Sequence, residues 1–146
     1  MTSRQGGQLS NGKKVLVIDD EESIIVYLTA ILEDFGYTPL SAMDAEEGAE
    51  IARAELPDFI CMDVMMPKMS GITLYQKFKQ DDRLAPIPVM FISAFSRVRD
   101  LRDPKAFRKM IPDENIPQPE VCLEKPIAVE EFVAVIEAHI GPGDEG

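Results

Sequence analysis

Four short apolar runs, each followed by polar residues, constrain the fold of this chain more than any other feature. The runs are VLVI, FICM, VMFI and VCL, and helical patterns separate them along the sequence. Unbroken apolar runs of this length are typical of parallel strands that are buried on both faces in an α/β domain. Ligands of such open sheets bind outside the carboxyl ends of the strands, so the polar residues there should converge. Those residues are Asp19, Asp20, Asp63, Ser93 and Lys125.

The remaining pattern predicts five βα units in a single domain. Strands are expected at 14–18, 37–42, 59–62, 89–92 and 121–123. Pro39 lacks a backbone donor, which favours an edge position for the second strand. Pro104 interrupts a helical pattern and a proline-rich stretch follows it. Residues 94–120 should therefore form a broken or short helix and then an ordered loop.

The overall charge excludes several classes of function. Fifteen basic and 26 acidic residues give a net charge of -11, which would repel nucleic acids and anionic lipid surfaces. No apolar stretch is long enough to span a membrane, and the N-terminus lacks the apolar core of a signal peptide. We therefore expect a cytoplasmic protein that binds neither nucleic acid nor membranes.

The polar, glycine-rich ends predict flexible tails at 1–12 and 141–146 around one domain at 13–140.

The two cysteines and the single histidine offer little further chemistry. Cys61 and Cys122 lie in predicted buried strands without neighbouring metal ligands, so we expect both to be reduced core thiols. His139 stands near the end of the last helical pattern, where a basic side chain interacts favourably with the helix dipole.

The three carboxylates at the strand ends predict a divalent cation. Mg²⁺, or Mn²⁺, prefers oxygen ligands from one or two carboxylates, a carbonyl and waters. Asp19, Asp20 and Asp63 supply such a set. Without a cation, two carboxylates about 4 Å apart repel by roughly 4 kcal/mol at an effective dielectric constant of about 20. The cluster therefore favours metal binding.

The same edge of the sheet can handle a phosphoryl group. Asp63 could attack phosphorus as a carboxylate nucleophile and form an aspartyl phosphate. Mg²⁺, Lys125 and the Ser93 hydroxyl would hold the three equatorial oxygens. Taken alone, an Asp-Asp pair after a strand usually caps a helix, and a Lys-Pro pair usually makes a turn. Their occurrence together at the ends of different parallel strands favours the functional interpretation.

These residues resemble the receiver domain of two-component response regulators. The matching segments are VLVIDDEES, FICMDVMMPKMSG, PVMFISAF and CLEKPI, and the resemblance covers residues 13–140. It implies a flavodoxin-like, doubly wound α/β fold, in which a five-stranded parallel sheet of order 2-1-3-4-5 has helices on both faces. The fourth-helix region should be irregular and extended, because residues 94–120 are longer than the family's single fourth helix.

The resemblance implies a role for each residue around the acceptor. Asp20 would be the direct Mg²⁺ ligand beside Asp19, and Met65 would offer its backbone carbonyl to the metal. Ser93 would be the switch hydroxyl, and Lys125 would contact the phosphate.

The implied function is signalling by phosphoryl transfer. Asp63 would accept a phosphoryl group from a phosphohistidine on a sensor histidine kinase or a histidine phosphotransfer protein. The chain would then be a stoichiometric acceptor that catalyses its own phosphorylation and dephosphorylation, and not an enzyme. We expect a stand-alone receiver whose output passes through an unidentified downstream protein.

Three positions depart from the pattern of the family. Cys122 stands where the family typically has an aromatic switch residue, so the usual aromatic readout should be altered. Met65 and Phe95 occupy the two positions that tune loss of the phosphoryl group. Neither side chain can orient a water molecule by hydrogen bonding, which predicts a long-lived phosphoryl group.

A basic run within residues 94–120 stands out in so acidic a chain. Two interpretations are open, a solvated helix face and a docking strip for an acidic partner. The run consists of Arg97, Arg99, Arg102, Lys105, Arg108 and Lys109.

Two other functions compete with a phosphorylated receiver. A haloacid-dehalogenase-type phosphatase also uses an Asp nucleophile after a parallel strand, but Met65 occupies the position of its general acid. An unphosphorylated pseudo-receiver that serves only as an interaction module is the main alternative. The complete set of Asp20, Asp63, Ser93 and Lys125 argues against that module.

Overall fold

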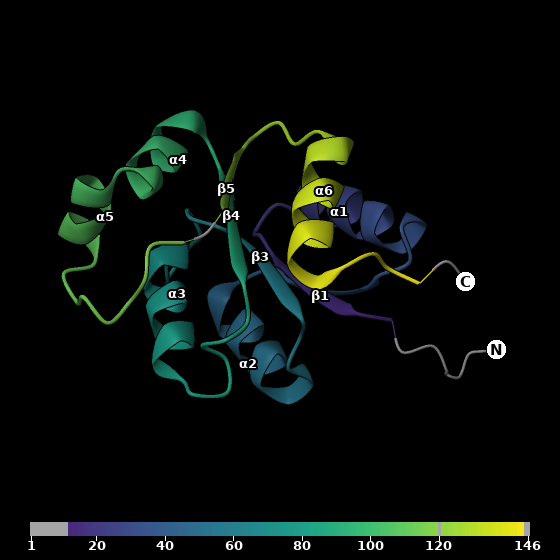
Figure 1. The fold of residues 1–146 in the computed structure, drawn as a ribbon, viewed down its shortest axis with the longest axis horizontal. Helices are drawn as coiled ribbons and strands as arrows, with labels where there is room; N and C mark the ends of the chain where they lie inside the picture. Colours follow the sequence, from purple (N-terminus) through teal and green to yellow (C-terminus); the bar gives the residue numbers. More distant parts are fainter. Residues whose placement is uncertain (1–11, 120, 145–146) are drawn as a thin grey trace.

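The computed structural model describes residues 12–119 and 121–144, with the side chains of 95–97 left out. Figure 1 shows a central sheet with helices on both of its faces. The sheet has five parallel strands in the order β2-β1-β3-β4-β5, which confirms the predicted topology. The strands are β1 (Lys14–Ile18), β2 (Thr38–Ala42), β3 (Phe59–Asp63), β4 (Val89–Ser93) and β5 (Val121–Glu124).

Within the described residues, six helices connect the strands and follow the last one. Because all strands are parallel, each connection must cross over a face of the sheet, and helices fill these crossovers. Figure 1 shows α1 and α6 together on one face, with the other helices on the opposite side or beyond the sheet. The helices are α1 (Glu22–Asp34), α2 (Ala45–Glu55), α3 (Gly71–Gln80), α4 (Phe95–Arg102), α5 (Pro104–Met110) and α6 (Val129–Ile140).

The alternating side chains of β1 show how the core is divided between the two faces. Val15 and Val17 pack with residues of α1 and α6. Leu16 and Ile18 pack with residues of α2, α3, α4 and α5. All four side chains are buried, and burying an aliphatic side chain of this kind contributes about 1.5–3 kcal/mol. The buried strands therefore form a rigid base whose carboxyl ends carry the polar residues.

The region after β4 confirms the expected broken helix and ordered loop. Asp103 separates α4 from α5, and its side chain accepts a hydrogen bond from the Ala106 N–H. Pro104 takes the first position of α5, where its missing donor costs nothing. The guanidinium group of Arg108 donates to the backbone carbonyls of the following loop, at Ile111, Asp113 and Ile116.

The segment after α6 packs against the turn between α1 and β2. The Tyr37 hydroxyl donates to the Gly141 carbonyl at 2.7 Å, and the Asp144 N–H donates to the Gly36 carbonyl at 2.9 Å. Gly36 has φ of +84°, and a Cβ there would lie 1.7 Å from the Asp144 carbonyl oxygen. We expected a flexible tail at 141–146, but residues 141–144 are held by these contacts. The tail expected at 1–12 falls outside the described residues except for Gly12.

The described residues contain no helix that is both long enough and apolar enough to cross a membrane.

Gly71 offers a test of how closely the backbone packs beneath the acidic edge. The Gly71 N–H donates to the Val64 carbonyl at 2.8 Å. A Cβ at position 71 would lie 2.1 Å from the Asp63 carbonyl oxygen. Because backbone atoms must move, Gly71→Ala should lower the free energy of unfolding by about 1–3 kcal/mol in urea titrations.

Gly48→Ala is the matched control for Gly71→Ala. The added methyl group would meet the side chain of Ile18, nearest at its Cδ1 atom, and Ala favours a helix by about 1 kcal/mol over Gly. The Cβ would lie 2.6 Å from this Cδ1 atom, so the buried Ile18 side chain must shift. A smaller loss than for Gly71→Ala is expected, because a side chain moves instead of the backbone and the gain in helix propensity offsets part of the cost. Equal loss of stability in the two variants would contradict the proposed backbone constraint.

Candidate functional site

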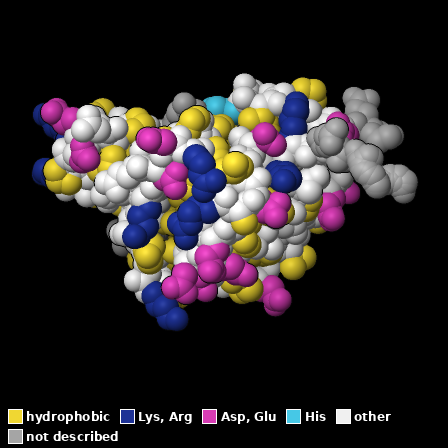
Figure 2. Space-filling view, turned by 90° about the horizontal axis from the view of Figure 1, so that it is seen from below, with side chains coloured by type: hydrophobic (Ala, Val, Ile, Leu, Met, Phe, Trp, Pro, Cys, Tyr) yellow, Lys and Arg dark blue, Asp and Glu magenta, His cyan; other side chains and the backbone are white. Residues whose placement is uncertain are grey.

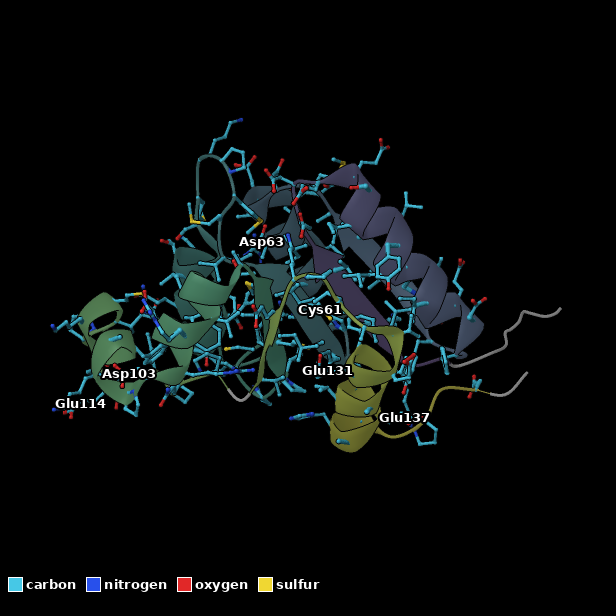
Figure 3. The ribbon with its side chains drawn as sticks, turned by 90° about the horizontal axis from the view of Figure 1, so that it is seen from above. Cys61, Asp63, Asp103, Glu114, Glu131 and Glu137 are labelled. Carbon is cyan, nitrogen blue, oxygen red and sulfur yellow. The ribbon has the colours of Figure 1, made fainter. Side chains whose placement is uncertain are left out.

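Three carboxylates gather at the carboxyl ends of β1 and β3. Asp19 and Asp20 follow β1, and Asp63 is the last residue of β3. One oxygen of each carboxylate lies within 4.8 Å of the others. Asp19 is 2% exposed and Asp63 is 6% exposed, whereas Asp20 is more accessible. Figure 3 shows Asp63 at the edge of the sheet where the connecting loops meet.

Lys125 brings a positive charge to this cluster from the end of β5. Its Nζ lies 3.3 Å from Asp19 Oδ2, 3.4 Å from Asp63 Oδ2 and 3.2 Å from Glu21 Oε1. The Lys125 N–H also donates to the Ser93 carbonyl at 2.9 Å, which continues the contact between β5 and β4. The peptide bond to the following proline is cis. A single ammonium group therefore contacts carboxylates from two strand ends and one loop.

The second oxygen of Asp63 accepts two weaker hydrogen bonds. The Ser93 hydroxyl and the Met65 N–H each donate to Asp63 Oδ1 at 3.3 Å. Ser93 is buried, while Met65 is 53% exposed. The two oxygens of Asp63 thus face different partners, the hydroxyl and backbone donor on one side and the ammonium group on the other.

Opposing influences act on the pKa of Asp19. Burial raises the pKa of its carboxyl group, and the charge of Asp63 adds to this rise. The hydrogen bond from the Glu21 N–H and the charge of Lys125 lower the same pKa, but the net direction is upward. Removal from water and a neighbouring like charge both disfavour an ionised carboxylate, so a further cation would relieve the site.

The pKa of Lys125 is also raised, but by neighbouring negative charge and not by burial. Burial alone would lower the pKa of its ammonium group, but the charges of Asp63 and Asp19 and the hydrogen bond to Glu21 outweigh burial and raise it. The side chain therefore stays charged at neutral pH. One positive charge among the surrounding carboxylates leaves the site negative, which fits a divalent cation bound through oxygen atoms.

Glu21 is the member of this site that sequence reasoning missed. An acidic side chain at the start of a helix has an ordinary explanation, because it interacts favourably with the helix dipole. Glu21 could have been identified from its position directly after the Asp-Asp pair, because a cation that binds the pair would also lie within its reach. Its side chain is 58% exposed, so its ion pair with Lys125 is partly screened by water.

Cys122 lies on the buried face of β5, at the position expected to carry a switch residue. It is 3% exposed and unpaired, as is buried Cys61, which confirms two free core thiols. Burial raises the pKa of the Cys122 thiol to about 11, although the charge of Arg102 opposes this rise. The Arg102 guanidinium donates to the Cys122 carbonyl. The side chain of Phe95, the other tuning position, lies outside the described residues.

The sequence matches the response regulator receiver domain family over residues 15–108. The polar-differentiation response regulator DivK of Brucella anthropi is 30% identical over 131 residues, which cover 88% of this chain and 97% of DivK. The alkaline phosphatase synthesis regulator PhoP of Bacillus subtilis is 45% identical over 75 residues, covering 51% of this chain and 31% of PhoP. This chain thus matches less than a third of the length of that transcriptional regulator.

Solved structures of receiver proteins have the same fold as this chain. A response regulator receiver domain protein from Clostridium thermocellum superposes with a TM-score of 0.72 at 25% identity, over 87% of this chain and 93% of the other. The chemotaxis response regulator CheY4 of Vibrio cholerae also superposes with a TM-score of 0.72, at 22% identity, over 87% and 98% of the two chains. The acidic edge, the sheet order and these matches define a signalling receiver. The chain belongs to the response regulator receiver family of two-component systems.

The buried thiol of Cys122 predicts slow chemical labelling. A pKa of about 11 leaves about a hundredfold less thiolate at pH 8 than an unperturbed thiol has. Iodoacetamide should therefore modify native Cys122 at least about a hundredfold more slowly than in urea, as followed by peptide mass spectrometry. Since a neutral thiol is favoured in the fold, stability should fall as pH rises from about 9 towards 11.

Cys61→Ala leaves Cys122 as the single thiol and provides the cleanest substrate for that rate. Labelling of the folded variant as fast as a free thiol would show that position 122 is open to solvent.

Proposed function

We propose that this chain is a phosphorylatable receiver that accepts a phosphoryl group on Asp63 from a phosphohistidine donor. The donor would be a sensor histidine kinase or a histidine phosphotransfer protein, and the output would be a contact with another protein in the cytoplasm. The observation that carries the proposal is the Lys125 ammonium group, which lies within 3.4 Å of both Asp19 and Asp63. Ser93 faces the other oxygen of Asp63.

Asp63 has the surroundings of a carboxylate nucleophile. One of its oxygens would form a bond to phosphorus while the bond from phosphorus to the donor imidazole nitrogen breaks, and the electron pair leaves with the imidazole. Lys125 would move from the Asp63 oxygen to a phosphoryl oxygen, and the Ser93 hydroxyl would donate to another. Both groups already lie next to Asp63, so small movements suffice.

The acidic cluster has the ligands that Mg²⁺ or Mn²⁺ requires. Asp19, Asp20 and Asp63 would hold the ion, with the backbone carbonyl of Met65 as a further ligand. When bound, the ion offsets negative charge on the phosphoryl oxygens and on the carboxylates. The chain would therefore catalyse its own modification once per donor, as a stoichiometric acceptor.

Phosphorylation can be tested directly by intact-mass spectrometry. Incubation with acetyl phosphate and Mg²⁺ should add one phosphoryl group to the protein, and removal of Mg²⁺ with a chelator should prevent this. Asp63→Asn removes the nucleophile with little change of shape, so it should gain no phosphoryl group.

Two results would contradict the proposal. A phosphoryl group that persists in Asp63→Asn would place the acceptor elsewhere. No adduct with any small-molecule donor, together with no Mg²⁺ binding by titration, would favour the unphosphorylated interaction module.

The lifetime of the phosphoryl group tests the residues beside the acceptor. Met65 is exposed next to Asp63, and its thioether cannot direct a water molecule at phosphorus. A variant with Met65→Asn and Phe95→Glu places two polar groups at the tuning positions. It should lose the phosphoryl group at least about tenfold faster, since positioned acid–base groups commonly accelerate such steps by more than this.

Decay is followed by intact mass after removal of the donor. Met110→Asn, at an exposed methionine of α5, is the control and should decay like the parent. If the double variant loses its phosphoryl group no faster than the parent, Met65 and Phe95 do not shield the acyl phosphate.

A further inference from the structure

The helix pair α4–α5 carries a charge opposite to that of the rest of the chain. Residues 95–110 contain six basic and two acidic side chains, whereas the remaining residues contain nine basic and 24 acidic ones. Figure 1 shows α5 at one end of the long axis of the molecule, on the side away from α1 and α6. The basic run is therefore concentrated on one projecting part of the fold.

Two arginines of this run donate hydrogen bonds to backbone carbonyls. The Arg102 guanidinium donates to the Cys122 carbonyl and ties α4 to β5. Arg108 donates to three carbonyls of the loop after α5, and its guanidinium lies 5.2 Å from the centre of the Phe107 ring. Arg108 is therefore a structural residue of this loop, whereas Arg102 has a structural partner but is still exposed.

Further side chains fasten the loop after α5 to the rest of the fold. The Gln118 amide donates to the carbonyls of Leu101 and Arg102 at 3.0 and 2.8 Å. The Tyr75 hydroxyl of α3 donates to the Pro117 carbonyl at 2.7 Å. These bonds hold α4 and α5 in place before any partner arrives, which reduces the entropy that binding must overcome.

Three cations of the run remain directed at solvent. The Arg99 side chain is 66% exposed, and its nearest carboxylate is that of Asp100 at 3.8 Å in the same helix. Lys105 and Lys109 are exposed and lie four residues apart in α5, so they share one face of that helix. Within the described part of the chain, neither lysine belongs to an ion pair.

An exposed apolar residue and acidic residues lie near these three cations. Met110 follows Lys109 and is 39% exposed, and a flexible thioether adapts to varied apolar partners. The Asp103 side chain is the N-cap of α5, so its negative charge interacts with the positive end of the helix dipole. Figure 3 shows Asp103 and Glu114 at this same end of the molecule, so the surface is basic with an acidic border.

We propose that Arg99, Lys105, Lys109 and Met110 form a docking face for an acidic segment of a partner protein that also carries apolar side chains. Opposite charges steer such a segment to this end of the molecule and fix its orientation. A short protein segment fits better than a nucleic acid, because a long polyanion would also run over the strongly acidic remainder. Figure 2 shows how acidic side chains border basic ones on the face seen from below.

A labelled synthetic peptide, mostly glutamate with two leucines, serves as the probe in fluorescence anisotropy with the full chain. The parent should bind it with an affinity that falls as salt rises. Charge reversal by Arg99→Glu, Lys105→Glu and Lys109→Glu together should weaken binding at least about tenfold, because each reversal replaces an attraction to the peptide by a repulsion. Met110→Ala alone should weaken binding without changing the salt dependence.

The matched control reverses three other exposed basic residues, Arg53 in α2, Lys77 in α3 and Arg83 after α3. It has the same net charge as the first triple variant and should bind the peptide within about twofold of the parent. Thermal unfolding verifies that both triple variants are folded. Both should also accept a phosphoryl group like the parent, which separates this proposal from the function proposed for Asp63.

Three outcomes would overturn the docking face. The parent could fail to bind the peptide at low salt, or the control triple variant could lose as much affinity as the first. An RNA oligonucleotide of the same charge could bind the parent as tightly as the peptide does, which would make the surface a general polyanion site.

Discussion

The ammonium group of Lys125 is the interaction on which the functional edge depends. It contacts Asp19 at the end of β1 and Asp63 at the end of β3, although more than sixty residues separate it from either in sequence. Carboxylates so close together repel one another, and burial strengthens that repulsion. A single cation at this place offsets part of it but leaves the cluster negative. The site can therefore bind a further cation while Asp63 still faces the open edge of the sheet.

The proposed phosphoryl chemistry and the proposed partner contact fall on different parts of one fold. Asp63 and Ser93 end the two strands β3 and β4, whose residues are all buried, so their positions are fixed by core packing. The α4–α5 pair lies beyond the sheet and is held by side-chain bonds to backbone carbonyls. Arg102 joins the two parts, because it binds the carbonyl of Cys122 three residues before Lys125. This link uses a guanidinium group and backbone, with no aromatic side chain at position 122.

The sequence predicted the site better than it predicted the surroundings. Apolar runs located the strands, and the polar residues after them met as expected at one edge. Glu21 was missed, because an acidic residue in a first helical turn has an ordinary explanation. Arg102 and Arg108 were grouped with a solvated or docking strip, but their partners are carbonyls in segments that only the fold brings near. Residues 141–144 were assigned to a tail, because their hydrogen bonds to Gly36 and Tyr37 leave no local pattern.

The sequence by itself determined the strand and helix segments, the parallel sheet and the polar residues that meet at its carboxyl edge. Those features follow from local patterns, since buried strands need unbroken apolar runs and ligands gather where parallel strands end. Only the tertiary structure decided which oxygens Lys125 contacts, which carbonyls Arg102 and Arg108 contact and which cations remain exposed. These contacts join residues far apart in the chain, and their geometry depends on the packing of whole helices against the sheet.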